Sequence, residues 1–148
     1  MSQVILQNKI MKDEATLSSL ISRNITSITI PDGVTSIGGY AFYNCSALTS
    51  VTIQNGTTSI GEQAFANCYA LNNLKISNSV TSIGEYAFST CRNLLSLTVK
   101  STSPPTLGDY AFQTTPSAVI YVPAESVDTY KAASGWSTYS SKIQAIPA

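Results

Sequence analysis

The chain lacks histidine altogether and carries few charged residues. Its 148 residues include eight basic and eight acidic side chains, which make up 11% of the sequence and leave no net charge. Without histidine, neither a Ser–His nor a Cys–His nucleophile system is possible, and the sequence contains no P-loop and no GxGxxG following a strand. A neutral chain also lacks the positive field that attracts nucleic acid. We therefore expect no enzyme activity, no cofactor and no nucleic acid partner.

Long apolar runs are missing as well. No segment approaches the ~20 apolar residues of a membrane helix, so we expect no membrane insertion. Residues 1–14, MSQVILQNKIMKDE, have neither the basic start nor the continuous apolar stretch of a secretory signal peptide. The remaining composition, poor in charge and rich in Ser and Thr, is common on exported and virion proteins. It favours an extracellular or cell-surface location, with a virion surface as the alternative.

Only three cysteines are present, Cys45, Cys68 and Cys91, spaced 23 residues apart. An odd number argues against a complete disulfide framework. The lack of histidine and of any CxxC pair argues against zinc, and we expect no metal site. The regular spacing predicts instead that each cysteine is a buried thiol that fills the same inward position as a small apolar group.

The cysteines belong to a sequence segment that occurs four times in the chain. It reads SIGGYAFYNC at 36–45, SIGEQAFANC at 59–68, SIGEYAFSTC at 82–91 and, less faithfully, TLGDYAFQTT at 106–115. Self-similarity with a period of 20 to 50 residues is typical of solenoids. The repeat predicts that the rings of Phe42, Phe65, Phe88 and Phe112 are buried and stacked. The glycine shared by all four copies predicts a position where a β-carbon would crowd the backbone.

A second block keeps the same period. It reads ITSITI at 25–30, LTSVTI at 48–53, LNNLKI at 71–76, LLSLTV at 94–99 and AVIYV at 118–122. Alternation of β-branched and polar residues predicts a strand with one buried face. Because each repeat supplies one such strand, we predict a right-handed solenoid with a parallel sheet of about five short strands.

The combined pattern, LxxLxI followed by VTSIGxxAFxxCxxL, resembles the BspA-type leucine-rich repeat over residues 25–123. Residues 120–136 are similar to the closing strand and capping helix of that family. The fourth copy departs from the pattern, because Thr115 replaces cysteine. The resemblance implies a leucine-rich repeat solenoid without catalytic activity. It also implies a surface-exposed adhesin, with host matrix proteins, other cells or glycans as partners.

Both ends of a solenoid need covers, and the two end segments together with the repeats are expected to form one continuous domain. Residues 1–24 are interpreted as an N-terminal cap, with Asp13 capping a short helix, or as an attachment or oligomerisation element. Residues 124–148 are interpreted as a C-terminal cap whose helix over 124–134 stops at Gly135. Trp136 is either a lid on the core or a platform for a sugar, and the lid is favoured.

The outward residues of the central strands form the candidate binding face. These are Ser50, Thr52, Asn73, Lys75, Ser96, Thr98 and Tyr121. Lys75 is the only charge and Tyr121 the only aromatic ring in the two rows that they form, so these two are expected to dominate the affinity. The runner-up is a column of three outward-leaning tyrosines, Tyr40, Tyr86 and Tyr110.

One column of carboxylates, Glu62, Glu85 and Asp109, shares a repeat position. Paired carboxylates occur in glycosidases and calcium sites, but a solvated surface column is favoured here. The functional prediction is therefore a non-enzymatic binding or adhesion module that presents its surface to a protein or glycan partner. The alternative is a structural or decoration protein of a virion or another extracellular assembly. The missing signal peptide and the non-repeat segment at residues 1–24 favour that alternative.

Overall fold

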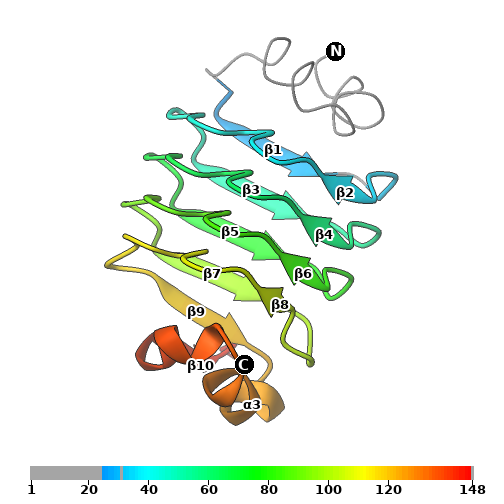
Figure 1. The fold of residues 1–148 in the computed structure, drawn as a ribbon, viewed down its shortest axis with the longest axis vertical. Helices are drawn as coiled ribbons and strands as arrows, with labels where there is room; N and C mark the ends of the chain where they lie inside the picture. The colour runs from blue at the N-terminus through cyan, green and yellow to red at the C-terminus, as the bar shows by residue number, and fades with distance from the viewer. Residues whose placement is uncertain (1–24, 31, 148) are drawn as a thin grey trace.

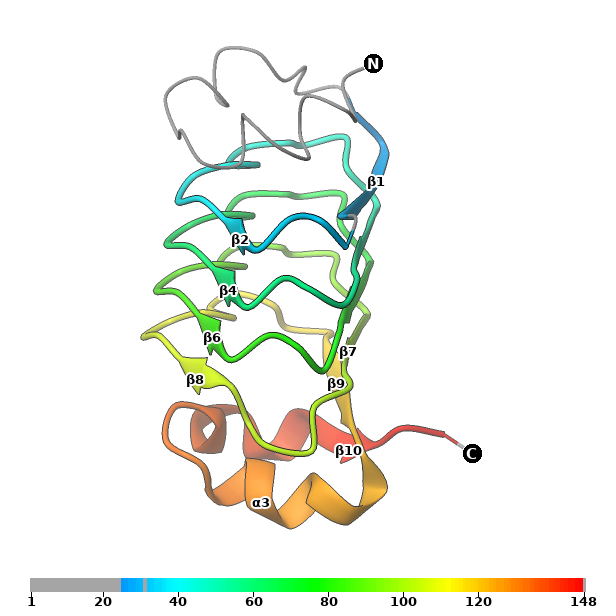
Figure 2. The ribbon, with the colours of Figure 1, turned by 90° about the vertical axis from the view of Figure 1, so that its right-hand side faces the viewer.

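The computed structural model describes residues 25–30 and 32–147, so the predictions for residues 1–24, including the Asp13 helix cap and the oligomerisation element, lie outside the described residues. Each repeat forms one rung with a strand on each of two sides, and the rungs stack along the long axis (Figures 1 and 2). The larger sheet, called the major sheet, contains in this order β1 (Ser27–Ile30), β3 (Ser50–Ile53), β5 (Asn73–Ile76), β7 (Ser96–Val99), β9 (Val119–Val122) and β10 (Ile143–Ala145).

Every pair of neighbouring strands in the major sheet is parallel, as predicted. The register advances by one repeat, so that Val51 lies beside Leu74 and Leu74 beside Leu97. The prediction of about five strands was short by one. β10 follows the repeats and pairs with β9, because Ile143 is buried beside Ile120 and extends the core into the C-terminal segment.

A second sheet, called the minor sheet, was not predicted. It consists of the two-residue strands β2 (Ser36–Ile37), β4 (Ser59–Ile60), β6 (Ser82–Ile83) and β8 (Thr106–Leu107), all paired in parallel. Figure 2 shows it on the side of the rungs opposite the major sheet. The Gly61 amide continues this ladder by donating to the Ile37 carbonyl at 2.8 Å, so each rung is hydrogen-bonded to the next on both sides.

The interior holds one continuous hydrophobic core, and the predicted phenylalanine column runs through it. The rings of Phe42, Phe65, Phe88 and Phe112 are at most 2% exposed and stack with centroid distances of 4.9, 5.2 and 5.6 Å. Backbone hydrogen bonds join the same rungs, because the Phe42 amide donates to the Ala64 carbonyl at 2.7 Å and the Phe65 amide to the Ala87 carbonyl at 2.8 Å. Dispersion contacts and hydrogen bonds therefore favour the same register.

The repeated glycine has the role that its position predicts. A β-carbon on Gly84 would lie 2.7 Å from the backbone nitrogen of Glu62 and 2.7 Å from the carbonyl carbon of Gly61 in the preceding rung. Gly61 and Gly108 are equally crowded by backbone atoms. Since backbone cannot move aside as a flexible side chain can, any larger residue here would force two rungs apart.

The C-terminal cap is helical but not one continuous helix, which corrects the prediction for 124–134. It comprises the 3₁₀ turn η2 (Ala124–Ser126), the helix α3 (Val127–Ala132) and the 3₁₀ segment η3 (Trp136–Lys142). Gly135 separates the last two with a φ of 83°, a value that glycine adopts without strain. Within the described part of the chain, no helix is both long and apolar enough to cross a membrane.

Tyr130 and Tyr139 attach this cap to the last rung. The buried Tyr130 hydroxyl donates to the Ser101 carbonyl at 2.6 Å, and burial raises the pKa of this phenol to about 12. The Phe112 amide donates to the Tyr139 hydroxyl at 3.2 Å. The cap thus takes the hydrogen bonds and ring contacts that a further repeat would have supplied.

The three cysteines are buried thiols, as predicted, and none forms a disulfide. Cys68 Sγ donates to the Phe42 carbonyl at 3.3 Å and Cys91 Sγ to the Phe65 carbonyl at 3.4 Å, each reaching back one rung. Thr115, in the fourth copy, instead donates to the Phe112 carbonyl of its own rung at 2.7 Å. Burial raises the pKa of the Cys91 thiol to about 12.

We expect the thiols to be unreactive in the folded chain, because burial both blocks access and disfavours the thiolate. Titration with a disulfide reagent at neutral pH should give almost no reaction without denaturant and three equivalents per chain in guanidinium chloride. Rapid labelling of one or more thiols in the native protein would contradict the burial described above.

Gly84→Ala should destabilise the chain by at least about 2 kcal/mol, since the added methyl group collides with backbone on the neighbouring rung. Gly33→Ala is the matched control, because nothing lies within 4 Å of its β-carbon position. Its free energy of unfolding should change by less than about 1 kcal/mol. Equal denaturation midpoints for the two variants would show that the rungs are not in contact at Gly84.

Candidate functional site

The seven residues predicted to bind lie together on the outer face of the major sheet. One row places Ser50, Asn73 and Ser96 side by side, with Val119 at its end. The other row places Thr52, Lys75, Thr98 and Tyr121 side by side. Asn73 and Lys75 are exposed and the other five side chains are partly exposed, whereas the residues that alternate with them are buried.

The geometry of a parallel sheet fixes these rows. Neighbouring strands are held ~4.8 Å apart by their hydrogen bonds, so side chains in one row stand at that interval. Their backbone loses little further freedom when a partner binds, which lowers the entropic cost of association. The outer face is therefore an ordered array of hydroxyl groups with one amide and one ammonium group.

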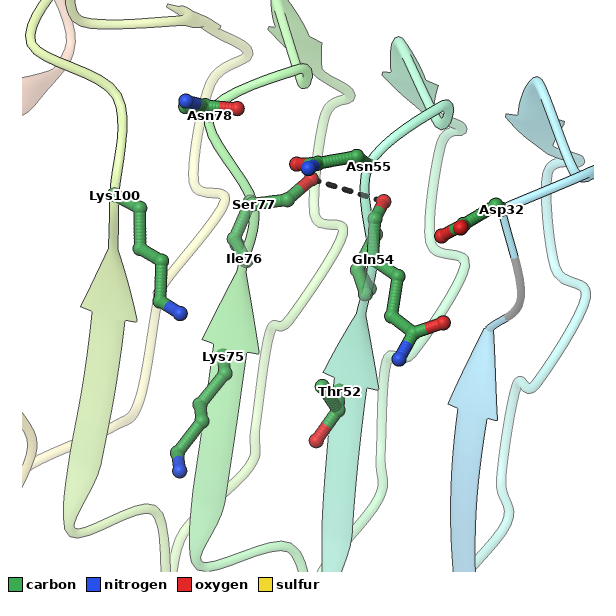
Figure 3. A pocket seen from close by; sticks show the side chains of 10 residues that line it. Asp32, Thr52, Gln54, Asn55, Lys75, Ile76, Ser77, Asn78 and Lys100 are labelled. Atoms are coloured by element: carbon green, nitrogen blue, oxygen red, sulfur yellow. Dashed lines mark hydrogen bonds between the residues drawn. The ribbon is translucent and has the colours of Figure 1, made fainter.

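A hollow of about 400 Å³ opens at the carboxyl-terminal edge of this face, and we call it the rim hollow (Figure 3). It contains Thr52 and Lys75 from the predicted site. It also contains residues that sequence reasoning missed as site residues, among them Asp32, Gln54, Asn55, Asn78 and Lys100. These five follow the strands at or near turn positions, and they meet only because successive rungs stack.

The floor of the rim hollow is held by hydrogen bonds between rungs. The buried Ser77 hydroxyl donates to the Gln54 carbonyl at 3.0 Å (Figure 3). Ser79 donates to the Thr57 carbonyl at 2.7 Å and accepts from the Gly56 amide at 3.2 Å. Gly56 has a φ of 111°, and a β-carbon there would collide with the Asp32 carbonyl oxygen. The turns beneath the hollow are therefore closely packed and ordered.

The runner-up column of tyrosines is interrupted. Gln63 occupies the second rung, where its amide donates to the Tyr40 hydroxyl at 3.0 Å. Tyr86 and Tyr110 stack with centroids 5.2 Å apart, and Tyr110 is 54% exposed whereas Tyr40 and Tyr86 are half-buried. The sequence prediction of an outward-leaning column thus holds for Tyr110 but not equally for the other two.

The backbone at this column is unusual for large residues. Tyr40, Gln63, Tyr86 and Tyr110 have φ values of 62°, 52°, 58° and 60°, in the left-handed region. In the first three rungs this conformation lets the amide donate to the next rung, as from Tyr40 to the Glu62 carbonyl at 2.9 Å. The hydrogen bonds that hold the stack therefore also account for the conformation.

The carboxylate column lies beside these tyrosines, since each carboxylate directly precedes the residue of the tyrosine column in its rung. Glu62, Glu85 and Asp109 are exposed and occupy one position in successive rungs, as predicted. Among residues 25–30 and 32–147, no three or more Asp, Glu, His or Cys side chains gather closely enough to hold a metal ion. The neutral chain thus carries its acidic column after the minor sheet, while Lys75 and Lys100 lie at the major sheet.

Trp136 is a lid on the core, and the sugar-platform interpretation is wrong. The indole is fully buried, packs on Phe112 with centroids 5.8 Å apart, and meets Tyr130 edge-on at 5.0 Å. Its Nε1 donates to the Pro105 carbonyl at 2.8 Å. No face of this ring is left for a ligand.

Stacked rungs with one major-sheet strand per repeat and a buried column of Leu, Ile, Phe and Cys define a leucine-rich repeat solenoid. Comparison with protein families agrees: the model of the BspA type leucine-rich repeat region matches residues 18–134 in six copies. The chain belongs to this family. These six copies are more than the four copies of the cysteine-containing segment and the additional strand block at 118–122 seen in the sequence. Membership of this family suggests a binding or adhesion module.

Among solved structures, three similar proteins are a leucine-rich cell surface protein from Faecalibacterium prausnitzii A2-165, a leucine-rich repeat protein from Bacteroides ovatus ATCC 8483, and the pneumococcal vaccine antigen PcpA. Their identities to the chain are 26, 22 and 16%, with TM-scores of 0.37, 0.41 and 0.41. The matches cover 66, 83 and 82% of this chain and 39, 43 and 40% of those chains. The chain therefore spans roughly two fifths of each structure. The search of curated proteins gave no match.

The burial of Trp136, the only tryptophan in the chain, is directly measurable by fluorescence. We expect a blue-shifted emission and weak quenching by acrylamide in the native protein, with both changing sharply on unfolding. Added saccharides should leave the emission unchanged. Strong quenching in the native protein would show that the indole is exposed and that the lid is misplaced.

Proposed function

We propose that the chain is a non-enzymatic binding module that presents the outer face of the major sheet to a protein or glycan partner. The observation that carries this proposal is the pair of ordered rows on that face, which end at the rim hollow. Solenoids offer extended surfaces of this kind, and a partner meets side chains that are already held in place.

The chemistry of the face supports binding rather than catalysis. The two rows contain hydroxyls, one amide, one ammonium group and one phenol among their polar groups. Lys75 lies between the hydroxyls of Thr52 and Thr98, and the described residues of the two rows include no carboxylate or imidazole to act as a general base. Among the residues that line the rim hollow, Asp32 is the one carboxylate.

The low-charge, hydroxyl-rich composition of the chain favours a location that is extracellular or at the cell surface, and we propose this location for it.

The outer face carries little charge, so the contact that we propose is broad and of modest affinity. Lys75 and Tyr121 supply its strongest groups, because a charged hydrogen bond and an aromatic ring contribute more than the small hydroxyls around them.

The test is a comparison of variants on a glycan array and on a panel of immobilised extracellular matrix proteins. Combined substitution of Lys75 and Tyr121 by alanine should weaken binding to whichever partner is found by at least about tenfold. The matched control, Lys131→Gln, changes an exposed lysine of the C-terminal helix α3 and should bind like the wild type.

A third variant distinguishes the outer face from the tyrosine column. Combined substitution of Tyr86 and Tyr110 by alanine removes the stacked pair and leaves the major sheet unchanged. If this variant alone loses binding while the Lys75 and Tyr121 variant keeps it, the partner contacts the tyrosines and the proposed face is wrong.

A further inference from the structure

The rim hollow is lined by two lysines, one aspartate and several amide and hydroxyl side chains. We propose that the rim hollow binds the acidic part of a glycan, a hydroxyl-rich chain that carries carboxylate or sulfate groups, with Lys75 and Lys100 contacting the anion. This inference rests on the proposed binding function and specifies the partner of one part of the outer face.

The distribution of cations supports an anionic ligand. The described residues contain five Lys and Arg side chains, and two of these, Lys75 and Lys100, line the same hollow. Arg92 lies over the Tyr69 ring at 4.9 Å, and Lys142 donates to the carbonyls of Thr115 and Pro116 at 3.0 and 3.1 Å. Those two cations contact other groups of the protein, whereas Lys75 and Lys100 come from two neighbouring rungs and line the hollow (Figure 3).

The remaining lining groups favour a saccharide over an acidic peptide. The side chains of Gln54, Asn55 and Asn78 each offer a donor and an acceptor, which matches sugar hydroxyls. Tyr and Trp, the usual anchors of a protein partner, are absent from the lining. The backbone cannot add a peptide strand either, because the amides of Ser77 and Lys100 already donate to Ile53 and Ile76 in the preceding rungs at 3.1 and 3.0 Å.

The two ends of the hollow differ in charge, which gives the ligand a direction. Asp32 follows β1 and Lys100 follows β7, three rung steps apart, or about 14 Å at the usual strand spacing. This length exceeds that of a single inorganic anion and suits several sugar units. The acidic group belongs at the lysine end, since Asp32 at the other end accepts from neutral hydroxyls and repels a second anion.

Hydrogen bonds between the turns beneath the rim hollow preorganise the site before a ligand binds. Ser77, Ser79 and Gly56 hold adjacent turns together through hydrogen bonds of 2.7 to 3.2 Å. Binding therefore has to immobilise only the outer ends of the lysine and amide side chains. Since both lysines are exposed to solvent, the attraction should weaken with added salt.

The experiment titrates the full chain with oligosaccharides of equal length and follows binding by backbone amide NMR. The probes are a hyaluronan tetrasaccharide, which carries carboxylates, a sulfated chondroitin tetrasaccharide, a neutral chitotetraose, and a hexaglutamate peptide as the acidic peptide. We expect both acidic saccharides to shift the amides of Ser77, Asn78 and Lys100 and to bind at least about tenfold more tightly than chitotetraose and hexaglutamate.

Variants locate the anion. Lys100→Gln should weaken both acidic saccharides by about fivefold to tenfold and leave chitotetraose unchanged, because one charge-assisted contact is lost. Lys131→Gln is the matched control and should bind like the wild type. Amide spectra of each variant without ligand check that the fold is kept.

Three results would overturn the inference: equal affinity for chitotetraose, equal affinity for hexaglutamate, or an unchanged affinity of Lys100→Gln. Each leaves the broader proposal testable, because the panel of matrix proteins and the variant at Lys75 and Tyr121 do not depend on Lys100. Loss of panel binding in the tyrosine-pair variant alone would instead overturn the choice of the outer face.

Discussion

Hydrogen bonding between successive rungs is the constraint on which the rest of the structure depends. A single rung leaves its strand amides and carbonyls without partners, and buried polar groups without partners are costly. The stack resolves this on both sides, through the parallel strands of the major sheet and through the minor sheet. Once the rungs are held at strand spacing, the phenylalanine rings must stack and the repeated glycine must remain glycine.

The same constraint makes the outer face. Because the register advances by one repeat, equivalent outward residues of successive repeats lie side by side and form a row. A substitution in one repeat therefore changes one position of that row. Lys75 therefore stands out among the hydroxyls of its row. At the strand ends, the rows pass into turns whose side chains also stack, and this stacking forms the rim hollow.

Much of the fold could be predicted from the sequence because the repeat carries it. The alternation in LTSVTI predicted which side chains of the strand point into the core and which point outward. The 23-residue spacing of Phe42 and Phe65 predicted that their rings stack. The minor sheet could not be predicted, since two residues such as Ser59 and Ile60 show no periodicity. β10 was missed because it lies outside the repeats and depends on long-range pairing with β9.

The site was less predictable than the fold. The two rows follow from alternation alone, but Asn55 and Asn78 are typical turn residues, and nothing local shows that they share a hollow with Lys100. The interruption of the tyrosine column by Gln63 is visible in the sequence, whereas the hydrogen bond to Tyr40 and the left-handed backbone are properties of the stacked rungs.

The central claim is that contacts between rungs hold the outer face and its rim in one fixed arrangement. Amide hydrogen exchange, measured residue by residue on the full chain, tests this most directly. We expect the amides of Ser77 and Lys100, which donate to the preceding rung, to exchange as slowly as those inside β5 and β7. Fast exchange at these two positions, with β5 and β7 still protected, would contradict it.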